Sequence, residues 1–343
     1  MIREDLGYAQ QVVTTIYDSN NNREIKTGFF LDTDGMPTAK AESGYMGYED
    51  TYVCGKWVKG QSYLYFWDND VWYRGLMRRH DKGYATIIIN FDSFGQCISE
   101  SYFDASDHAV CRLDEEDGAE LCARIEYDYD EYGNTAGIRY KNVSGNMMIH
   151  RDWGYAQVRN EHDGQGNLTE QRHYDANNEP IARPGGFFSV SWFYDNGNCT
   201  ETRYYDAEKE LMMRSDENYA IQKEQYDEYG RSILSTYCNT EGEPVINTVY
   251  GCAGFEYKYD QWGNETDIIY RDTEGDMMVR ERLGFAWIKM EYDEWGRLEV
   301  KKYFDAEQNP TADLKGCAEI RYEYDEQGIQ HERAFDLNGT ELQ

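Results

Sequence analysis

Hydrophobic and polar residues alternate along several short segments of this chain. In residues 286–292, "AWIKMEY", Ala, Ile, Met and Tyr occupy every second position, and Trp, Lys and Glu lie between them. Residues 318–324 repeat the pattern with Glu, Arg and Glu at the intervening positions. A period of two with one charged face is typical of a half-buried strand. No segment has convincing helical periodicity, so the predicted fold class is all-β.

The alternating segments recur at a fixed interval. A turn of the form Tyr-Asp-x-x-Gly-Asn/Arg follows the first segment of most units, and a second turn with Asp or Asn follows 11 or 12 residues later. The first-turn aspartates are Asp92, Asp130, Asp163, Asp195, Asp227, Asp260, Asp293 and Asp325. After one step of 38 residues, their intervals are 33, 32, 32, 33, 33 and 32 residues. One hairpin cannot bury its apolar face alone, so we expect about ten of them stacked in an elongated, solenoid- or shell-like array.

A longer rhythm runs through the same units. The pairs Met147–Met148, Met212–Met213 and Met277–Met278 recur at steps of 65 residues, and the units between them carry Pro180, Pro244 and Pro310. The sequence therefore predicts a double unit of 65 residues. We also expect a column of small residues at Ala253, Ala286 and Ala318, because each follows a Gly-x pair at the same place in its unit.

Residues 45–83 interrupt the repeat. This segment concentrates aromatic residues, among them Trp57, Trp67 and Trp72. Divergent units of repeat arrays serve as caps or carry a binding site. We therefore expect an N-terminal repeat unit at 1–44, a divergent aromatic-rich unit or cap at 45–83, and a regular array at 84–343, with the three tryptophans as candidate ligand-binding residues.

The composition narrows the classes of partner. The 343 residues include 34 Lys and Arg against 65 Asp and Glu, which gives a formal net charge of −31. Nucleic acids and anionic membrane surfaces are unsuitable partners for such a chain. No apolar run of about 18 residues occurs, so no membrane insertion is expected. The segment "MIREDLGYAQ" has no apolar core of a signal peptide, and the compartment stays open between the cell surface or exterior and the cytoplasm.

The candidate chemistry is sparse. No nucleophile, metal-protease or phosphate-loop motif occurs, so we expect no catalytic residues and no enzyme. Cys122, Cys252 and Cys317 share a column with aromatic residues, which favours buried thiols over disulfides. No cofactor is expected. Calcium held by the turn aspartates is the open alternative to aspartates that only accept backbone hydrogen bonds.

One aromatic residue stands directly before the turn glycine in several units. These residues are Tyr132, Tyr229, Trp262 and Trp295, with Phe94 in an earlier unit. Their neighbours are polar, so the rings could be exposed and stack on sugars or on quaternary ammonium groups. The alternative is that each ring covers the next turn of the array.

The Tyr-Asp-x-x-Gly turns at 127–134, 226–231, 259–264 and 292–297 resemble the YD repeats of the RHS family. The second turn is similar, more weakly, to aromatic cell-wall-binding repeats. The first resemblance implies a β-rich shell or spiral on a bacterial secreted or surface protein that encloses or displays a toxin. We therefore expect a non-catalytic binding or scaffolding module for a glycan or protein partner. The alternatives are a structural shell segment of an RHS-like toxin system and a calcium-stabilised adhesin.

Overall fold

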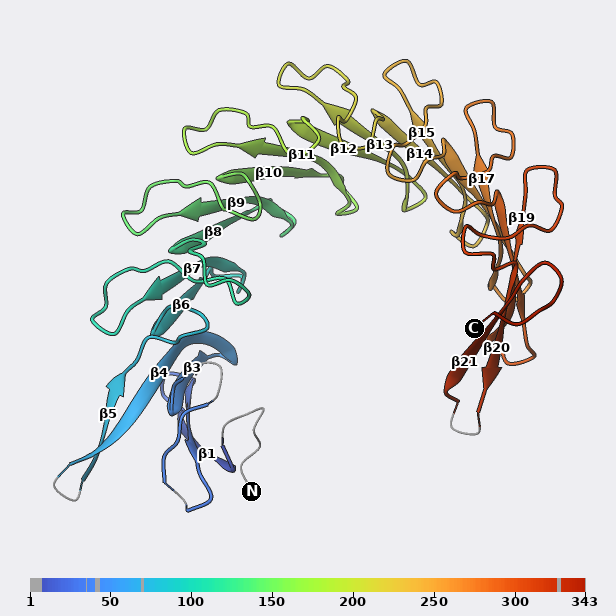
Figure 1. Ribbon diagram of the computed structural model, residues 1–343. Coiled ribbons are helices and arrows are strands. Elements are labelled where there is room, and N and C mark those ends of the chain that lie inside the picture. Colours follow the sequence, from blue (N-terminus) through green and yellow to red (C-terminus); the bar gives the residue numbers. More distant parts are fainter. Residues whose placement is uncertain (1–7, 35, 41–43, 69–70, 326–327, 343) are drawn as a thin grey trace. The chain divides into compact units, whose positions relative to one another are not determined.

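The computed structural model describes residues 8–34, 36–40, 44–68, 71–325 and 328–342, with the side chains at 65–68 and 71–73 left out. The chain divides into two compact units, and Figure 1 labels strands of both. The N-terminal unit comprises Met1–His162 and Arg172–Ile181, and the C-terminal unit comprises Asp163–Gln171 and Ala182–Gln343. In both units the described residues form antiparallel strands and no helix. The all-β prediction is therefore confirmed.

The strands of the N-terminal unit are β1 (Gln10–Asp18), β2 (Arg23–Leu31), β3 (Gly47–Val53), β4 (Lys56–Asp68), β5 (Val71–Leu76), β6 (Thr86–Phe91), β7 (Cys97–Phe103), β8 (Arg124–Tyr129), β9 (Thr135–Lys141) and β10 (Gln157–His162). Strand β11 (Leu168–Tyr174) has residues in both units. The C-terminal unit holds β12 (Ser189–Asp195), β13 (Asn198–Tyr205), β14 (Ile221–Tyr226), β15 (Ser232–Cys238), β16 (Gly254–Tyr259), β17 (Glu265–Arg271), β18 (Trp287–Tyr292), β19 (Leu298–Phe304), β20 (Glu319–Tyr324) and β21 (Gln330–Phe335).

Consecutive strands pair as hairpins, and neighbouring hairpins share only a short ladder. Strands β16 and β17 pair over their full length, whereas β15 pairs with β16 through three residues, Leu234 to Thr236. The strands of neighbouring hairpins therefore separate toward the first turns. Backbone groups in the separated part need other partners, because a buried carbonyl without one is costly.

The tyrosine of the first turn supplies that partner. The hydroxyl of Tyr259 donates a hydrogen bond of 2.8 Å to the carbonyl of Ser232, at the start of the second strand of the preceding hairpin. The equivalent pairs are Tyr129 with Cys97, Tyr194 with Leu168, Tyr226 with Cys199, Tyr292 with Glu265 and Tyr324 with Leu298. In these six hairpins the tyrosine of the repeat motif thus links the hairpin to the one before it, whereas Phe91 and His162 occupy this position in β6–β7 and β10–β11.

The aspartate of the same turn organises its own loop. Asp130 Oδ1 accepts the backbone N–H groups of Tyr132 and Asn134, each at 2.9 Å. Gly133 has a φ of 91° and donates its N–H to the Asp130 carbonyl. The second turns repeat this geometry, with Asn142 and Asn239 among the acceptors. An amide oxygen accepts the same two bonds, which explains why Asn replaces Asp there.

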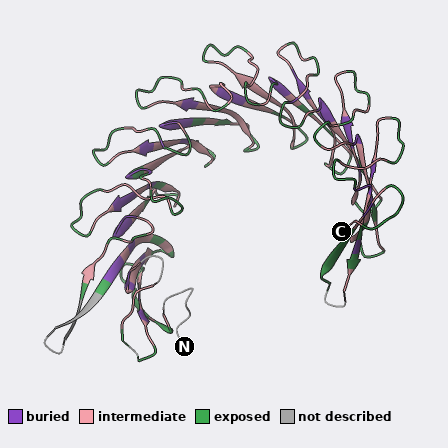
Figure 2. Cartoon of the chain, viewed as in Figure 1, coloured by how far each residue is buried: buried purple, intermediate pink, exposed green. Residues whose placement is uncertain are grey.

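The core of each unit is a ladder of aromatic rings at the base of the hairpins. In the C-terminal unit Phe285 stacks on Tyr303 with ring centroids 4.3 Å apart and contacts Tyr270 on its other side. Cys252 and Cys317 occupy ring positions of the same cluster and are buried. Buried residues lie on and beside the strands, and the turns are exposed (Figure 2).

The alanine column lies beside this ladder. Ala286 is fully buried, donates its N–H to Phe304 of its own hairpin, and accepts the N–H of Tyr270 from the preceding one. Ala253 and Ala318 make the equivalent pairs of bonds. The prediction that these alanines share one setting in successive hairpins is confirmed.

Proline and methionine occupy equivalent backbone positions in neighbouring hairpins. Pro244 and Met277 each form an isolated bridge to the last residue of the preceding strand. The residue after the bridge donates the hydrogen bond, as Val245 does to Tyr237 and Met278 does to Tyr270. The N–H of the bridging residue is not used, so proline fits. Neighbouring hairpins thus have the same backbone arrangement at this position, and the 65-residue period comes from the alternation of the side chains there.

The divergent segment at 45–83 differs from the regular units because it contains one long strand, β4. The first half of β4 pairs with β3 and β6, and its second half pairs with β5 in an additional hairpin. This arrangement accounts for the break in the repeat at 45–83. The three-part division at 1–44, 45–83 and 84–343 differs from the two compact units and stays a prediction.

Candidate functional site

The first turns of the C-terminal unit present three aromatic rings to solvent. Tyr229, Trp262 and Trp295 are 75%, 79% and 71% exposed, and they lie on the consecutive hairpins β14–β15, β16–β17 and β18–β19. Such exposure excludes the alternative in which each ring covers the next turn. Large apolar side chains that gather in the open are typical of binding surfaces.

The turns that carry these rings are adjacent. A Cβ placed on Gly263 would lie 3.3 Å from Nη1 of Arg231 in the preceding turn, and one on Gly296 would lie 3.7 Å from Oδ1 of Asn264.

Two arginines pack against rings of this row. The Arg297 guanidinium carbon lies 4.9 Å from the centre of the Trp295 ring and 4.4 Å from that of Tyr324 in the next hairpin. Arg231 lies in the same way between Tyr229 and Tyr259, at 5.0 and 4.5 Å. Asp227 and Asp293 hold these guanidinium groups through Nε at 2.7 Å. Tyr229 and Trp295 are therefore positioned by cation–π contacts while most of their surface stays open, and Asn264 takes the place of the arginine in the turn of Trp262.

The N-terminal unit has a shorter version of this row. Phe94 is 88% exposed and Tyr132 is 72% exposed, on the consecutive hairpins β6–β7 and β8–β9. Gln96 Nε2 donates a 2.8 Å hydrogen bond to the Gly133 carbonyl, so these two turns also lie side by side.

Among the hairpins from β6–β7 to β18–β19, two depart from the aromatic pattern. Gln165 stands at the equivalent position of the turn after Asp163. Asp195 was expected to begin a first turn like the others, and this expectation is wrong. Asn196 and Gly197, with φ of 51° and 84°, form a two-residue turn between Asp195 and Asn198. An Asn-Gly pair favours this tight hairpin, and it leaves no room for an exposed ring.

A groove of about 920 Å³ crosses one face of three hairpins, β12–β13, β14–β15 and β16–β17, in the C-terminal unit. Trp192, Tyr226 and Tyr257 are among the aromatic residues that line it, with Glu224 and Glu265 between the rings. Burial raises the pKa of Glu265. The groove lies on the same sheet face as the tyrosines that link the hairpins, and neither it nor the linking role of those tyrosines was anticipated from the sequence.

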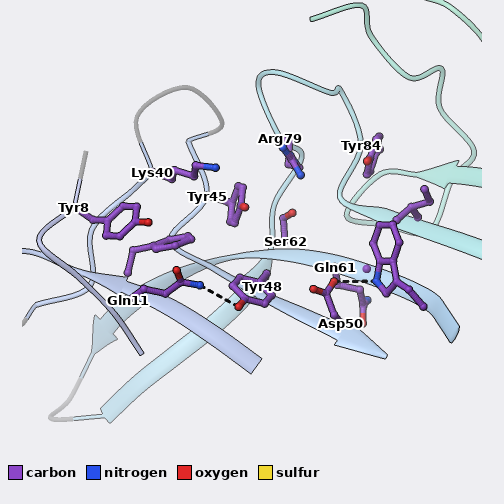
Figure 3. A pocket seen from close by; sticks show the side chains of 14 residues that line it. Tyr8, Gln11, Lys40, Tyr45, Tyr48, Asp50, Gln61, Ser62, Arg79 and Tyr84 are labelled. Carbon is purple, nitrogen blue, oxygen red and sulfur yellow. Dashed lines mark hydrogen bonds between the residues drawn. The ribbon is translucent and has the colours of Figure 1, made fainter. Parts of the chain in front are cut away.

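The three tryptophans of the divergent segment are placed differently from one another. Trp57 lies in β4, is 36% exposed, and donates its Nε1–H to Asp50 Oδ1 at 3.0 Å. It lines a cavity of the N-terminal unit (Figure 3). Trp67 and Trp72 belong to β4 and β5, and their side chains lie outside the described residues.

The structure bears on two further kinds of site that the sequence raised, metal sites and reactive thiols. Among the described residues, no group of three His, Cys, Asp or Glu side chains is placed to hold a metal ion. All eight cysteines are free, and Cys122, Cys238, Cys252 and Cys317 are buried, as the buried-thiol interpretation predicts. Burial raises the pKa of the Cys122 thiol to about 12. A thiol of this kind is a packing group rather than a nucleophile.

The described part of the chain also contains no helix that is long and apolar enough to cross a membrane.

No protein-family model and no curated protein matches this chain. Among solved structures it is similar to TcdB2-TccC3 without its hypervariable C-terminal region, with 12% identity, 92% of this chain and 15% of that chain covered, and a TM-score of 0.30. The Photorhabdus luminescens Tc holotoxin pore matches at 12% identity over 92% of this chain and 16% of that chain, with a TM-score of 0.24. A porin-like protein from Bacteroides uniformis matches at 9% identity over 96% and 97% of the two chains, with a TM-score of 0.19.

The chain spans about 15% of the length of the TcdB2-TccC3 chain that it matches. TM-scores this low do not show that this chain shares a fold with these proteins.

Proposed function

We propose that this chain is a non-catalytic, solenoid-like β-repeat module that binds a neutral glycan through the aromatic rings of its first turns. Tyr229, Trp262 and Trp295 form the contact row, and Tyr132 has the same role in the N-terminal unit. The observation that supports the proposal most directly is that these rings are exposed although the turns around them are tightly hydrogen-bonded. A preformed set of rings binds with little loss of conformational entropy.

The residues beside the rings suit a sugar. Glu228, Gln261 and Glu294 each precede a ring of the contact row and are exposed. Their oxygens accept hydrogen bonds from hydroxyl groups, while the C–H face of a pyranose packs on the aromatic ring. The net charge of −31 disfavours sulfated or uronic acid chains, because like charges repel. We therefore propose a neutral glycan, which implies a location at the cell surface or outside the cell.

The test is binding of the chain and of a double variant, Trp262→Ala with Trp295→Ala, to an array of neutral glycans. We expect the double variant to lose binding and to change its free energy of unfolding by no more than about 0.5 kcal/mol per site, because both positions are exposed. Trp153→Ala, at a half-exposed ring outside the first turns, is the control and should bind normally. Glycan binding that survives the double substitution refutes the proposal.

Other partners give different results in the same experiment. A blank array together with capture of a protein that requires Trp262 and Trp295 would move the proposal to a protein partner. A calcium-stabilised adhesin would instead show a rise in melting temperature when calcium is added. The shell-segment alternative stays a prediction that no particular residue of the structure favours.

A further inference from the structure

We infer that the N-terminal unit carries a second and separate binding site, a pocket for a single neutral pyranose ring. The pocket has a volume of about 340 Å³ and lies over strands β2, β3 and β4 (Figure 3). Tyr8, Tyr45, Tyr48, Asp50, Trp57 and Arg79 are the lining residues that matter here. This volume is at the lower end of the range for small-molecule sites, which fits a ligand of one sugar ring.

Two glycines in the strands let aromatic rings lie flat as the floor of the pocket. A Cβ placed on Gly60 would come within 2.5 Å of Cζ2 of Trp57, and one on Gly28 would overlap the Tyr48 ring. Neither glycine has a positive φ, so the reason for glycine here is space rather than backbone conformation. Both rings thus pack against the strands at these glycines, and both line the cavity.

A carboxylate is fixed at the edge of this floor. Asp50 Oδ1 accepts the Trp57 Nε1–H at 3.0 Å, and burial raises the pKa of Asp50. No ion pair joins Asp50 to a cation within the part of the chain that the structure describes. Among the described residues the hydrogen bond to the Asp50 carboxylate goes to Oδ1, so Oδ2 can accept a hydroxyl hydrogen bond from a ligand. A carboxylate held beside aromatic rings offers a hydrogen-bond acceptor for sugar hydroxyl groups and an apolar surface for the C–H face of the sugar ring.

The surrounding charges favour a neutral ligand. The Arg79 guanidinium carbon lies 5.0 Å from the centre of the Tyr45 ring, and Lys40 lines the same cavity. Arg79 is paired with Asp81, so Lys40 is the positive group that disfavours a quaternary ammonium ligand, which aromatic rings would otherwise attract. Asp50 in turn disfavours an anion. Figure 3 shows Tyr45 and Arg79 on the side of the cavity opposite Tyr48 and Asp50, so a ring between them would meet polar groups on two sides.

The test is ligand-detected nuclear magnetic resonance of the full chain with glucose, galactose, mannose, N-acetylglucosamine and choline. We expect saturable binding of at least one sugar and none of choline. Asp50→Asn keeps the shape and the bond from Trp57 but removes the charge, and it should weaken sugar binding about tenfold, the value of a hydrogen bond to a charged group. Gly60→Ala should displace the Trp57 ring and abolish binding.

Folding is controlled by Gly164→Ala, at a turn position where an added Cβ meets no atom within 4 Å. Binding of choline alone, binding of no sugar, or sugar binding that both Asp50→Asn and Gly60→Ala leave unchanged would each refute the pocket. The double substitution at Trp262 and Trp295 should leave monosaccharide binding unaffected. Because each site has its own variants and its own ligand, failure of this inference is distinguishable from failure of the glycan proposal.

Discussion

At the scale of single residues, one tyrosine hydroxyl group connects a hairpin to the one before it in six of the hairpins. Tyr259 illustrates the link, because its hydroxyl reaches the Ser232 carbonyl at the point where the strands of neighbouring hairpins separate. Tyr→Phe substitution removes this single donor and leaves the ring in place. The carbonyl then loses its partner in a part-buried position.

We expect Tyr259→Phe to lower the free energy of unfolding by about 1 kcal/mol, the net value of one intramolecular hydrogen bond. Tyr229→Phe is the matched control, since it makes the same chemical change three residues upstream of Ser232 on a ring that is mostly exposed. Urea unfolding of both variants measures the difference. Equal stabilities would show that the hydroxyl link does not hold the hairpins together.

The turn carboxylates make stability depend on acid. The N–H donated by Glu179 holds the pKa of Asp175 below its ordinary value of 3.8. A lowered folded pKa stabilises the folded state above the ordinary pKa, and this contribution is lost as the pH falls through the lowered value. Asp175→Asn keeps the acceptor oxygen but has no carboxyl group to titrate. The melting temperature of this variant minus that of the wild type should therefore be larger at pH 3 than at pH 7, and the change should occur below about pH 4.

Thermal unfolding at several pH values measures this effect. Glu208→Gln removes an exposed carboxylate from the equivalent turn of a later hairpin and is the control. If Asp175→Asn and Glu208→Gln show the same pH profile, the turn bonds are not the cause of the acid sensitivity.

At the residue scale, the sequence predicted the positions of the turns but not the contacts of their side chains. The Tyr-Asp-x-x-Gly pattern identified Tyr132, Trp262 and Trp295 as candidates, and the structure shows these rings exposed. Whether a ring lies open or covers its neighbour depends on the angle between hairpins, which no local pattern specifies. The pocket around Asp50 escaped prediction because its residues come from separate parts of the chain.

At the scale of elements, each unit is built from hairpins whose backbone geometry is shared. The alternation of polar and apolar residues predicted strands such as β18 and β20 and their buried faces. Asp195 was misassigned because Tyr-Asp is common to two kinds of turn, and only the following Asn-Gly selects the tighter one. The additional hairpin in β4 and β5 was missed because its residues lack the repeat spacing.

The bridge position offers a sharp test of the shared backbone. Met277→Pro should change the free energy of unfolding by less than about 1 kcal/mol, because the bridging N–H makes no ladder bond there. Met278→Pro removes the N–H that donates to Tyr270 at 3.0 Å, and it should cost about 2 kcal/mol more than Met278→Ala, which accounts for the side chain. Chemical denaturation of the three variants measures their free energies of unfolding. Equal losses of stability in Met277→Pro and Met278→Pro would contradict the assigned bridge.

At the scale of the whole molecule, the contacts within each unit run mainly between neighbouring hairpins. A local perturbation should therefore stay local, as in other repeat proteins. Ala286→Leu adds three carbons in a fully buried column and should destabilise by about 1–3 kcal/mol through overpacking. Hydrogen exchange should rise in β17 and β18, while β12 and β13 of the same unit keep their protection.

Mass spectrometry of backbone amide exchange measures this pattern strand by strand. A uniform loss of protection across the C-terminal unit would mean that its hairpins unfold together, contrary to the expectation. Ala220→Leu, at a fully buried alanine nearer to β13, should shift the region of increased exchange toward that strand.

The hydroxyl link also bears on how such a chain gains or loses length in evolution. Excision of residues 226–258 would place Tyr259 where Tyr226 now stands, within reach of the Cys199 carbonyl, and the joint would be chemically equivalent to the original. Duplication of one hairpin would likewise create a fresh acceptor for the next tyrosine. Copy number can therefore drift by whole modules, and every module added with its ring lengthens the row of exposed aromatic residues.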